Sequence, residues 1–527
     1  MRYRAGVPER KSLRQELIAH RAPGWFEDAK LGIFIHWGLY SVPAWAPPGR
    51  SLPDLVRDHF WDLQKWSPYA EWYQNAMRIE GSPTSRHHAE VWGDAPYEAF
   101  RKPFERTLER WDPDAWAERF AAAGARYVVL VTKHHDGYCL WPSGVPSPRR
   151  PGWHAPRDVV GDVAAAVRAR GLRFGVYYSG GLDWSFEAGP ILGLLDTLAC
   201  VPLGADYARY VEAHYRELIA RYAPSVLWND IAYPAGPALY RLLHDYLDAV
   251  PDGAINDRFL PVGRWARTLR LAPVRALAGA VVRRTFARPG VPFGPPPTPH
   301  GDFRTPEYAS FPKARRRKWE TTRGVGHSFG LNRAESEEDR IDPAELVRGF
   351  VDLVAKNGNL LLNVGPSAEG EIPEEQALRL EALGSWLREN GEAIYATRPW
   401  RRAEGRTECG VAVRFTAGPE AVYAILLGAP RGERVTLSGA PAAAGSATQR
   451  VELLGHGPLE VSVEADRVQL AWPRGLREAP AYALRFPGWP RAAGPPGGGS
   501  ARSVISSLRH AAPPPAPAVR RHGGSDR

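Results

Sequence analysis

Five short apolar runs that favour β structure each end in aromatic, imidazole or carboxylate side chains. The run 225–230 is the clearest, because it stops at Trp228, Asn229 and Asp230. A (β/α) barrel builds its active site from groups at the carboxyl ends of short buried strands. The other runs, with the polar residues that follow them, are 32–38, 127–137, 173–184 and 253–258. The sequence therefore predicts a barrel with its functional groups gathered at one end.

Helical segments alternate with these runs. Asp112 and Pro113 supply an N-cap and a first-turn proline for a helix that Gly124 ends, directly before the run at 127. Further helices are predicted at 158–170, at 206–222 and from Asp342 onward. Repeated units of this kind imply a parallel sheet, and their number predicts an α/β fold, a (β/α)8-like barrel, over residues 1–398.

Residues 399–489 have a different pattern. Short strands with period-two alternation, separated by glycine and proline turns, predict an antiparallel β-sandwich domain after the barrel. The Pro/Gly/Arg-rich stretch 490–527 is predicted to be a disordered tail. The strands are expected at 411–415, 422–426, 434–437, 450–453, 459–463, 468–472 and 482–486.

The net charge of +10 comes from two appendages. An insert at 259–301 holds seven arginines and no acidic residue, and the tail from Arg491 holds six arginines against Asp526 alone, so the rest of the chain is close to neutral. Neither segment interleaves aromatic residues as a stacking platform for bases, so nucleic acid is not an expected partner. The stretch from Trp265 to Phe286 predicts a basic amphipathic helix, and a solvated surface excursion is favoured there over a membrane- or partner-binding role.

Three observations bear on the compartment of the protein. No apolar run is long enough to span a membrane, and the first six residues lack the apolar core of a secretory signal. Cys139, Cys200 and Cys409 are widely spaced and form no disulfide or metal pattern. We therefore expect a cytoplasmic protein without a membrane partner, and self-association stays open.

The groups at the strand ends suit a sugar. Breaking a glycosidic bond needs one acid and one carboxylate, and Asp230 beside Trp228 lies where such a carboxylate belongs, although it would equally serve as a helix cap. His134 and His135 suggest metal ligands, but adjacent strand-end residues point in different directions and no second cluster completes a site. Hydrogen bonds to sugar hydroxyls are therefore the preferred interpretation, and neither a metal nor a cofactor is expected.

Seven sequence blocks together resemble the retaining α-L-fucosidases, and they occur in that family's order from about residue 20 to residue 400. The blocks are 25–38, 133–137, 177–184, 227–230, 256–258, 319–324 and 357–366. The resemblance implies hydrolysis of a fucosylated oligosaccharide or glycoconjugate through a covalent fucosyl-enzyme. It implies that Asp230 is the nucleophile and that Glu307, within 302–308, is the acid/base.

The resemblance also implies a set of sugar-binding residues. These are His36, Glu71, Trp72, His134, His135, Tyr178, Trp228, Arg258 and Phe329. From the residues alone, Glu71 and Trp72 suit a helix face packed on the core equally well. The chain departs from the family's short loop, because the insert places Glu307 49 positions after Arg258.

Other functions remain as alternatives. A fucoside-binding protein without catalysis would lack one carboxylate, and a glycosidase for a related sugar would differ in the pocket facing the sugar's C5 substituent. A metal-dependent hydrolase built on the histidine pair would lose its activity on chelation.

Overall fold

The computed structural model describes residues 7–187, 189–236, 238–286, 288, 297–438, 450–464, 467–487 and 489. The predicted disordered tail at 490–527 lies outside these residues. No helix among the described residues is long and apolar enough to cross a membrane.

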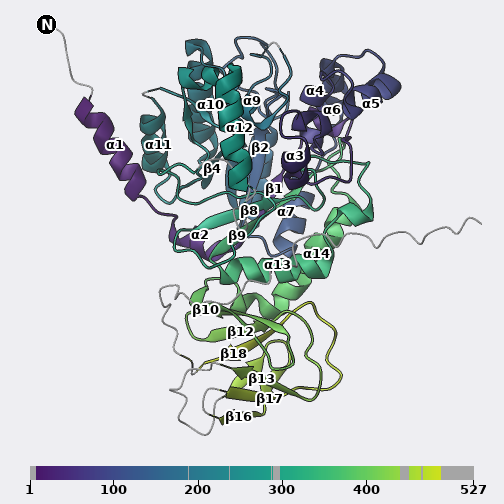
Figure 1. Cartoon of the computed structure of the whole chain (residues 1–527), viewed down its shortest axis with the longest axis vertical. Coiled ribbons are helices and arrows are strands. Elements are labelled where there is room, and N and C mark those ends of the chain that lie inside the picture. The colour runs from purple at the N-terminus through teal and green to yellow at the C-terminus, as the bar shows by residue number, and fades with distance from the viewer. Residues whose placement is uncertain are drawn as a thin grey trace, which may run out of the picture. The chain divides into compact units, whose positions relative to one another are not determined.

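A curled parallel sheet of seven strands forms the centre of the first part of the chain (Figure 1). The five runs predicted from the sequence are all strands of this sheet, joined by β8 and β9. In spatial order the strands are β6 (Ala254–Ile255), β4 (Val226–Asn229), β3 (Arg173–Tyr178), β2 (Tyr127–Lys133), β1 (Leu31–Ile35), β9 (Gly358–Val364) and β8 (Trp319–Arg323).

The gap between the edge strands β6 and β8 is filled by residues 302–308, which we call the seam. Isolated parallel bridges join Asn256 to Phe303 on one side, and Arg304 to Trp319 and Glu307 to Thr322 on the other. The seam thus takes the place of an eighth strand, which confirms the predicted barrel.

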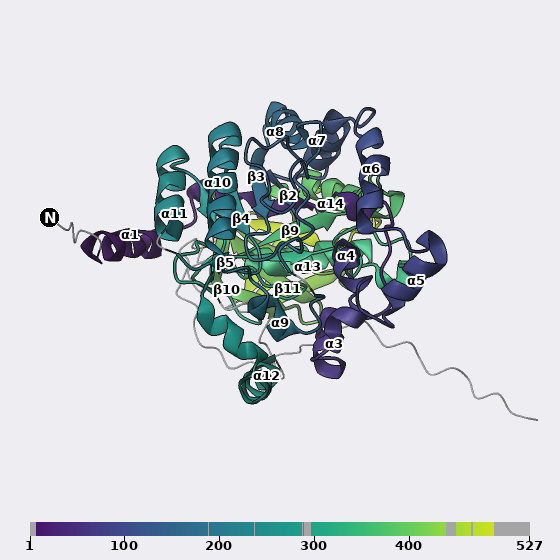
Figure 2. The ribbon, with the colours of Figure 1, turned by 90° about the horizontal axis from the view of Figure 1, so that it is seen from above.

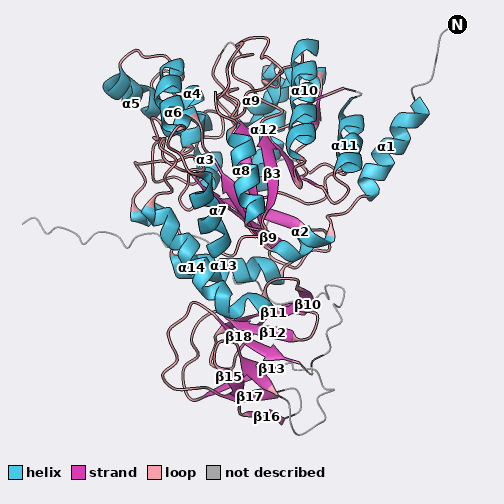
Figure 3. Cartoon of the chain, turned by 180° about the vertical axis from the view of Figure 1, so that it is seen from behind, coloured by secondary structure: helices cyan, strands magenta, loops and turns pink. Residues whose placement is uncertain are grey.

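Helices surround the barrel, as the cyan ribbons around the magenta strands show (Figure 3). Asp112 caps α7 through a side-chain bond to a backbone N–H group, as the sequence predicted, and Asp158 and Asp342 cap α8 and α13 in the same way. The helices are α1 (Val7–Ala19), α2 (Gly24–Ala29), α3 (Leu52–Asp58), α4 (Tyr73–Ala76), α5 (Pro83–Trp92), α6 (Arg101–Thr107), α7 (Pro113–Ala122), α8 (Val159–Ala169), α9 (Leu194–Ala199), α10 (Ala205–Tyr222), α11 (Ala238–Ala249), α12 (Ala272–Phe286), α13 (Pro343–Ala355) and α14 (Glu374–Asn390).

Period-two alternation decides which strand residues face the barrel interior. On β3, Tyr177 joins an inner cluster with Phe34 and Trp228, whereas its neighbour Tyr178 joins the outer layer between the sheet and the helices. The same alternation holds on β2, where Val129 is inner and Val128 is outer. Both layers are buried, so these strands read as continuous apolar runs.

Two antiparallel sheets follow the barrel, as predicted, and enclose a separate apolar core. The predicted strand at 459–463 is divided at Glu460 into two strands of different sheets. One sheet has the order β10 (Arg398–Arg406), β11 (Ala412–Ala417), β12 (Val422–Leu426), β18 (Tyr482–Phe486), β14 (Val451–Leu453) and β15 (Gly457–Leu459). The other has the order β13 (Arg434–Ser438), β17 (Arg467–Ala471) and β16 (Val461–Glu464).

Candidate active site

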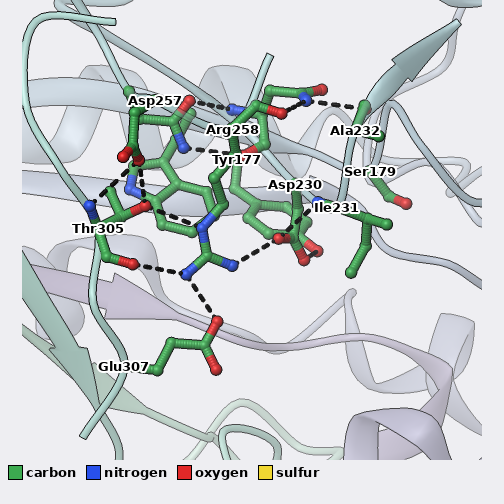
Figure 4. A network of polar contacts seen from close by, with 12 residues as sticks. Tyr177, Ser179, Asp230, Ile231, Ala232, Asp257, Arg258, Thr305 and Glu307 are labelled. Atoms are coloured by element: carbon green, nitrogen blue, oxygen red, sulfur yellow. Dashed lines mark hydrogen bonds and ion pairs between the residues drawn. The ribbon is translucent and has the colours of Figure 1, made fainter. Parts of the chain in front are cut away.

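Asp230 follows the last residue of β4 and faces the barrel mouth with both oxygens engaged (Figure 4). Tyr177 Oη donates to Asp230 Oδ2 at 2.8 Å, and Arg258 Nη1 donates to Oδ1 at 2.7 Å. The backbone N–H of Ile231 donates to Oδ1 at 2.8 Å. The side chain is 11% exposed, so this carboxylate is held in a fixed orientation at an open position.

Arg258 spans two carboxylates with one guanidinium group. Its Nη1 binds Asp230, and its Nη2 lies 2.6 Å from Glu307 Oε1 (Figure 4). The guanidinium carbon lies 4.5 Å from the centre of the Trp228 ring, a cation–π arrangement. The structure therefore brings together Asp230, Glu307, Arg258 and Trp228, although 79 positions separate Trp228 from Glu307.

Side chains that follow β6 hold the seam in place. Thr305 donates to Asp257 Oδ1 through its backbone N–H at 3.1 Å and through Oγ1 at 2.7 Å. Thr305 Oγ1 and its carbonyl oxygen accept from Arg258 Nε and Nη2, at 2.9 and 3.1 Å. Glu307 therefore owes its position to a side-chain network and to the isolated bridges of the seam.

Burial dominates the electrostatics of Glu307. Loss of solvation raises the pKa of its carboxyl above the ordinary value, and the negative charge of Asp230 raises it further, against the opposing effect of Arg258. Glu307 is thereby kept in its protonated form to higher pH than a solvated glutamate. A carboxylic acid and a carboxylate side by side are the pair that acid-assisted cleavage requires.

The residue after each carboxylate has a left-handed backbone. Ile231 has φ of 64° and Tyr308 has φ of 48°. Neither is a glycine, and Ile231 is β-branched, so each of these conformations costs on the order of 1–3 kcal/mol. Backbone strain of this kind persists only where the surrounding contacts hold the residue in place. Here these are the contacts that also orient Asp230 and Glu307.

Two buried histidines present an unprotonated nitrogen to the mouth. Asn363 Nδ2 donates to the Phe329 carbonyl oxygen, so its Oδ1 faces His36 Nδ1 at 2.5 Å and requires a hydrogen there. Ser179 Oγ donates to Leu182 O, so it accepts from His135 Nδ1 at 2.6 Å. In each neutral ring Nε2 is then the acceptor, and His135 Nε2 lies 3.8 Å from Asp230 Oδ2.

Burial keeps these imidazoles neutral. It lowers the pKa of His36 to about 4 and lowers the pKa of His134 and His135 well below the usual range. The His134 ring is tilted against the His135 ring, with ring centres 4.1 Å apart, and its buried Nδ1 has no hydrogen-bond partner among the described residues. Neutral imidazoles that accept and donate suit hydroxyl groups better than charged ones do.

Trp72 and Phe329 lie against the histidines, and Glu71 lies beside Gly330, the residue after Phe329. Glu71 Oε2 accepts from the backbone N–H of Gly330 at 2.8 Å, and burial raises the pKa of Glu71 to about 7. Trp72 packs edge-on against His135, with ring centres 5.0 Å apart. Phe329 lies 5.1 Å from the His36 ring. The structure thus places these three residues beside the histidines.

Comparison with known proteins identifies the family to which this arrangement belongs. A family model described as Alpha-L-fucosidase matches residues 8–392. The chain belongs to the α-L-fucosidase family. Members of this family are glycoside hydrolases, which is consistent with the carboxyl pair at the barrel mouth.

Individual relatives match most of the chain. Human tissue alpha-L-fucosidase is 30% identical over 459 residues, which cover 84% of this chain and 84% of that protein. Human plasma alpha-L-fucosidase is 32% identical over 471 residues, or 87% of this chain and 88% of that one. The crystal structure of Thermotoga maritima alpha-fucosidase in complex with a mechanism-based inhibitor matches with a TM-score of 0.74 at 39% identity, covering 90% of this chain and 98% of that chain.

The structure does not bring Tyr178, which was predicted to bind the sugar, to the mouth of the barrel. Tyr178 is the last residue of β3, and its hydroxyl lies 3.0 Å from His214 Nδ1 on α10, in the layer between sheet and helices. Tyr177 occupies the inner position and contacts Asp230. Side chains alternate between the two faces of a strand, so only one of two successive tyrosines faces the barrel interior. Because both residues are tyrosines, the sequence does not indicate which of them it is.

Sequence reasoning also missed the supporting residues of the site. Ser179 and Asn363 orient the histidines, while Asp257 and Thr305 hold the seam. The sequence analysis quoted the motifs that contain them without giving these residues a role. Their strand-end positions were the available signal, since such positions point into the mouth of a barrel.

Residues able to hold a metal ion gather elsewhere. Among the described residues, His244, Asp245 and Asp248 on α11 bring ligand atoms within 4.8 Å of one another. This cluster is partly exposed, and exposed acidic groups commonly gather without an ion. His134 and His135 are instead committed to ring packing and to Ser179.

Proposed function

We propose that this member of the family hydrolyses terminal α-L-fucosides with retention, with Asp230 as the nucleophile and Glu307 as the acid/base. The observation that carries the proposal is the single guanidinium of Arg258 that binds both carboxyl groups. In retaining glycosidases the two carboxyl groups lie about 5–5.5 Å apart, too close to admit a water between them. Two carboxyl groups bound to one guanidinium are held close together, which supports the retaining arrangement.

In the first step Asp230 Oδ attacks the anomeric carbon while the glycosidic C–O bond breaks. The proton of Glu307 passes to the departing oxygen, so the leaving group departs as a neutral alcohol. Arg258 donates to Asp230 Oδ1 and holds that carboxylate in place for attack, and burial favours the protonated form of Glu307.

In the second step Glu307 changes from acid to base because Asp230 has lost its negative charge. Asp230 is then an uncharged ester, so it no longer raises the pKa of Glu307, while Arg258 continues to lower it. Glu307 ionises more readily and takes a proton from the incoming water, which attacks the anomeric carbon and releases Asp230. The shared arginine therefore assists the switch of Glu307 from acid to base.

We propose that the sugar ring lies between the imidazoles and the aromatic wall. His36 and His135 accept from hydroxyl groups through Nε2, and His134 and Glu71 offer further polar contacts. Trp72, Trp228 and Phe329 supply the apolar surface, with Phe329 placed to contact the C5 methyl group that distinguishes fucose from galactose-type sugars. A methyl contact gives only about 1–3 kcal/mol of discrimination, so related sugars are slower substrates rather than excluded ones.

We also propose the domain organisation predicted from the sequence, a barrel at 1–398 and a sandwich at 399–489. The start of β10 at Arg398 and a separate apolar core that begins at Trp400 support this boundary. A fucosylated oligosaccharide or glycoconjugate is the proposed substrate class, because the chain belongs to the α-L-fucosidase family.

The first experiment measures hydrolysis of nitrophenyl α-L-fucoside, with nitrophenyl β-D-galactoside as the comparison sugar. We expect faster turnover of the fucoside, and NMR of the first product should give the α anomer, which later mutarotates. The β anomer as first product would overturn the retaining mechanism. A folded protein that binds fucose without turnover would overturn hydrolysis and support the binding-protein alternative.

A further inference from the structure

The insert carries an exposed apolar surface, which we call the α12 face, defined by Trp265, Leu271, Leu277 and Val281. Their exposed fractions are 52%, 57%, 70% and 58%. They make up four of the eight large apolar side chains that are exposed among the described residues. Figure 2 shows α12 at the edge of the barrel, projecting away from the strands.

The inner side of α12 already has its partner. Ala278, Val282 and Phe286 pack on an apolar cluster that also contains Trp72 of the barrel mouth. A side chain at Gly279 would clash with Trp61, and Arg275 forms an ion pair with Asp196. The inner side of the helix is therefore packed on the barrel. The exposed apolar residues form a second surface, on the outer side of the helix.

The outer side has the spacing of a helical stripe. Leu277, Val281 and Arg284 follow one another at i, i+4 and i+7, and all three are exposed. Leu271 directly precedes the helix, and Trp265 lies in the preceding 3-10 turn, Arg264–Arg270. The stripe on α12 thus combines large apolar side chains with arginine.

The charged residues of the insert itself all carry one sign, and its carboxylate partners, Asp196 and Glu187, bind Arg275 and Arg270. Arg264, Arg283, Arg284 and Arg288 have no carboxylate partner among the described residues, and no acidic residue occurs anywhere in 259–301. A second copy of the chain docking face to face would place arginine against arginine, which is unfavourable. Charge complementarity instead requires an anionic surface.

We propose that the α12 face docks on the surface of an anionic lipid bilayer. Apolar side chains that enter the interface, flanked by arginines that bind acidic headgroups, are the combination that holds an amphipathic helix in the plane of a membrane. The convex shape of a single helix suits a bilayer surface. This inference is independent of the proposed hydrolysis and concerns where the enzyme works rather than what it cleaves.

The test is co-sedimentation of the full-length protein with vesicles of phosphatidylcholine, with or without an equal share of phosphatidylglycerol. We expect binding to the anionic vesicles at about 0.1 M salt and release at about 1 M salt, where the screening length falls to about 3 Å. Arg283→Gln with Arg284→Gln should weaken binding by about thirtyfold. Leu277→Glu with Val281→Glu should weaken it by at least about tenfold.

Matched variants separate this face from the basic tail, which every protein in the test retains. Leu378→Glu changes an exposed leucine of α14, and Arg106→Gln with Arg110→Gln removes two exposed arginines near α6. Both controls should bind like the parent, and nitrophenyl fucoside turnover confirms that each variant is folded. Parental binding by the α12 variants would assign the membrane contact to the tail and overturn the proposal. Failure of the parent to bind anionic vesicles, or equal binding to neutral ones, would overturn it as well.

Discussion

The two carboxyl groups at the mouth are held by different kinds of structure. Asp230 follows a regular strand, β4, whose neighbours β3 and β6 pair with it in register. Glu307 lies on the seam, which is joined to β6 and β8 by isolated bridges and to Asp257 and Arg258 by Thr305. The comparison teaches that Asp230 follows a strand paired on both sides, whereas Glu307 is held by backbone hydrogen bonds to β8 on one side and largely by side-chain contacts on the other.

The largest expected effect on turnover comes from a change at Asp230, the carboxyl group that follows a regular strand. Asp230→Ala removes the proposed nucleophile, and we expect the turnover of nitrophenyl α-L-fucoside to fall by ~10⁴-fold. Sodium azide should restore part of the rate, because a small anion can enter the vacated space and attack the anomeric carbon. Asp252→Ala, on an exposed turn, is the matched control and should keep parental activity. Parental turnover by Asp230→Ala would assign the nucleophile to another residue.

The second effect tests the carboxyl group of the seam. Glu307→Gln should lower turnover of fucosides with poor leaving groups by about 10²–10⁴-fold, because the proton donor is lost. The first step on a dinitrophenyl fucoside, seen as a burst of dinitrophenol, should change little, because that leaving group needs no proton.

The pH profile sharpens the assignment of Glu307. Burial raises its pKa, and the reaction needs the protonated form, so the rate of the first step should fall as pH rises through that raised pKa. With Glu307→Gln, the burst rate on the dinitrophenyl substrate should lose this alkaline limb. An unchanged limb in the variant would mean that a different group supplies the proton.

A smaller effect should distinguish the seam from the strands. Thr305→Val keeps the side-chain volume but removes the hydroxyl between Asp257 and Arg258, and we expect kcat on poor leaving groups to fall by about tenfold. Thr132→Val removes a similar buried bond on β2, from Oγ1 to the Tyr177 carbonyl oxygen. We expect this control to lose about 1 kcal/mol of stability and little activity. Equal losses of activity in both variants would contradict the proposed difference between the seam and the strands.

The smallest effect concerns stability inside the barrel. Glu320 on β8 accepts from Tyr127 and Trp228, and burial raises its pKa to about 7 from an ordinary 4.5. Between these values the folded protein holds a proton that the unfolded chain releases, so this group makes stability fall as pH rises from about 4.5 to about 7. Glu320→Gln should flatten the decrease of the melting temperature over that window. Glu389→Gln, an exposed change on α14, should leave it as it is in the parent.

The same division explains what could be predicted from the sequence. The strands of the barrel and the caps at Asp112, Asp158 and Asp342 follow from local patterns, because burial on both faces and capping chemistry act over a few residues. The motif around Glu307 was recognised by resemblance, but its path was not predictable, since the seam is formed by contacts between distant segments. Tyr178 was chosen over Tyr177 because the register of β3 against the barrel interior is a tertiary property.

The α12 face illustrates a second limit. The sequence predicted a basic helix from Trp265 to Phe286 and favoured a solvated excursion. The helical period and the charge can be read from the sequence. The sequence does not tell which apolar residues of the helix pack against the barrel. Val282 and Leu277 look alike in the sequence, yet one packs on the barrel and the other is 70% exposed.

The seam also bears on how the enzyme responds to heat. Among the described residues, one backbone hydrogen bond, from the Asp302 N–H to the Ile255 carbonyl oxygen, joins the seam to β6, so the barrel can open locally at this edge while the seven regular strands stay paired. We expect the amide hydrogens along this edge to exchange with solvent at a lower free energy of opening than those of β2 or β9. Because the proposed acid, Glu307, lies on the seam, we expect activity to disappear on warming at a temperature where the barrel is still folded.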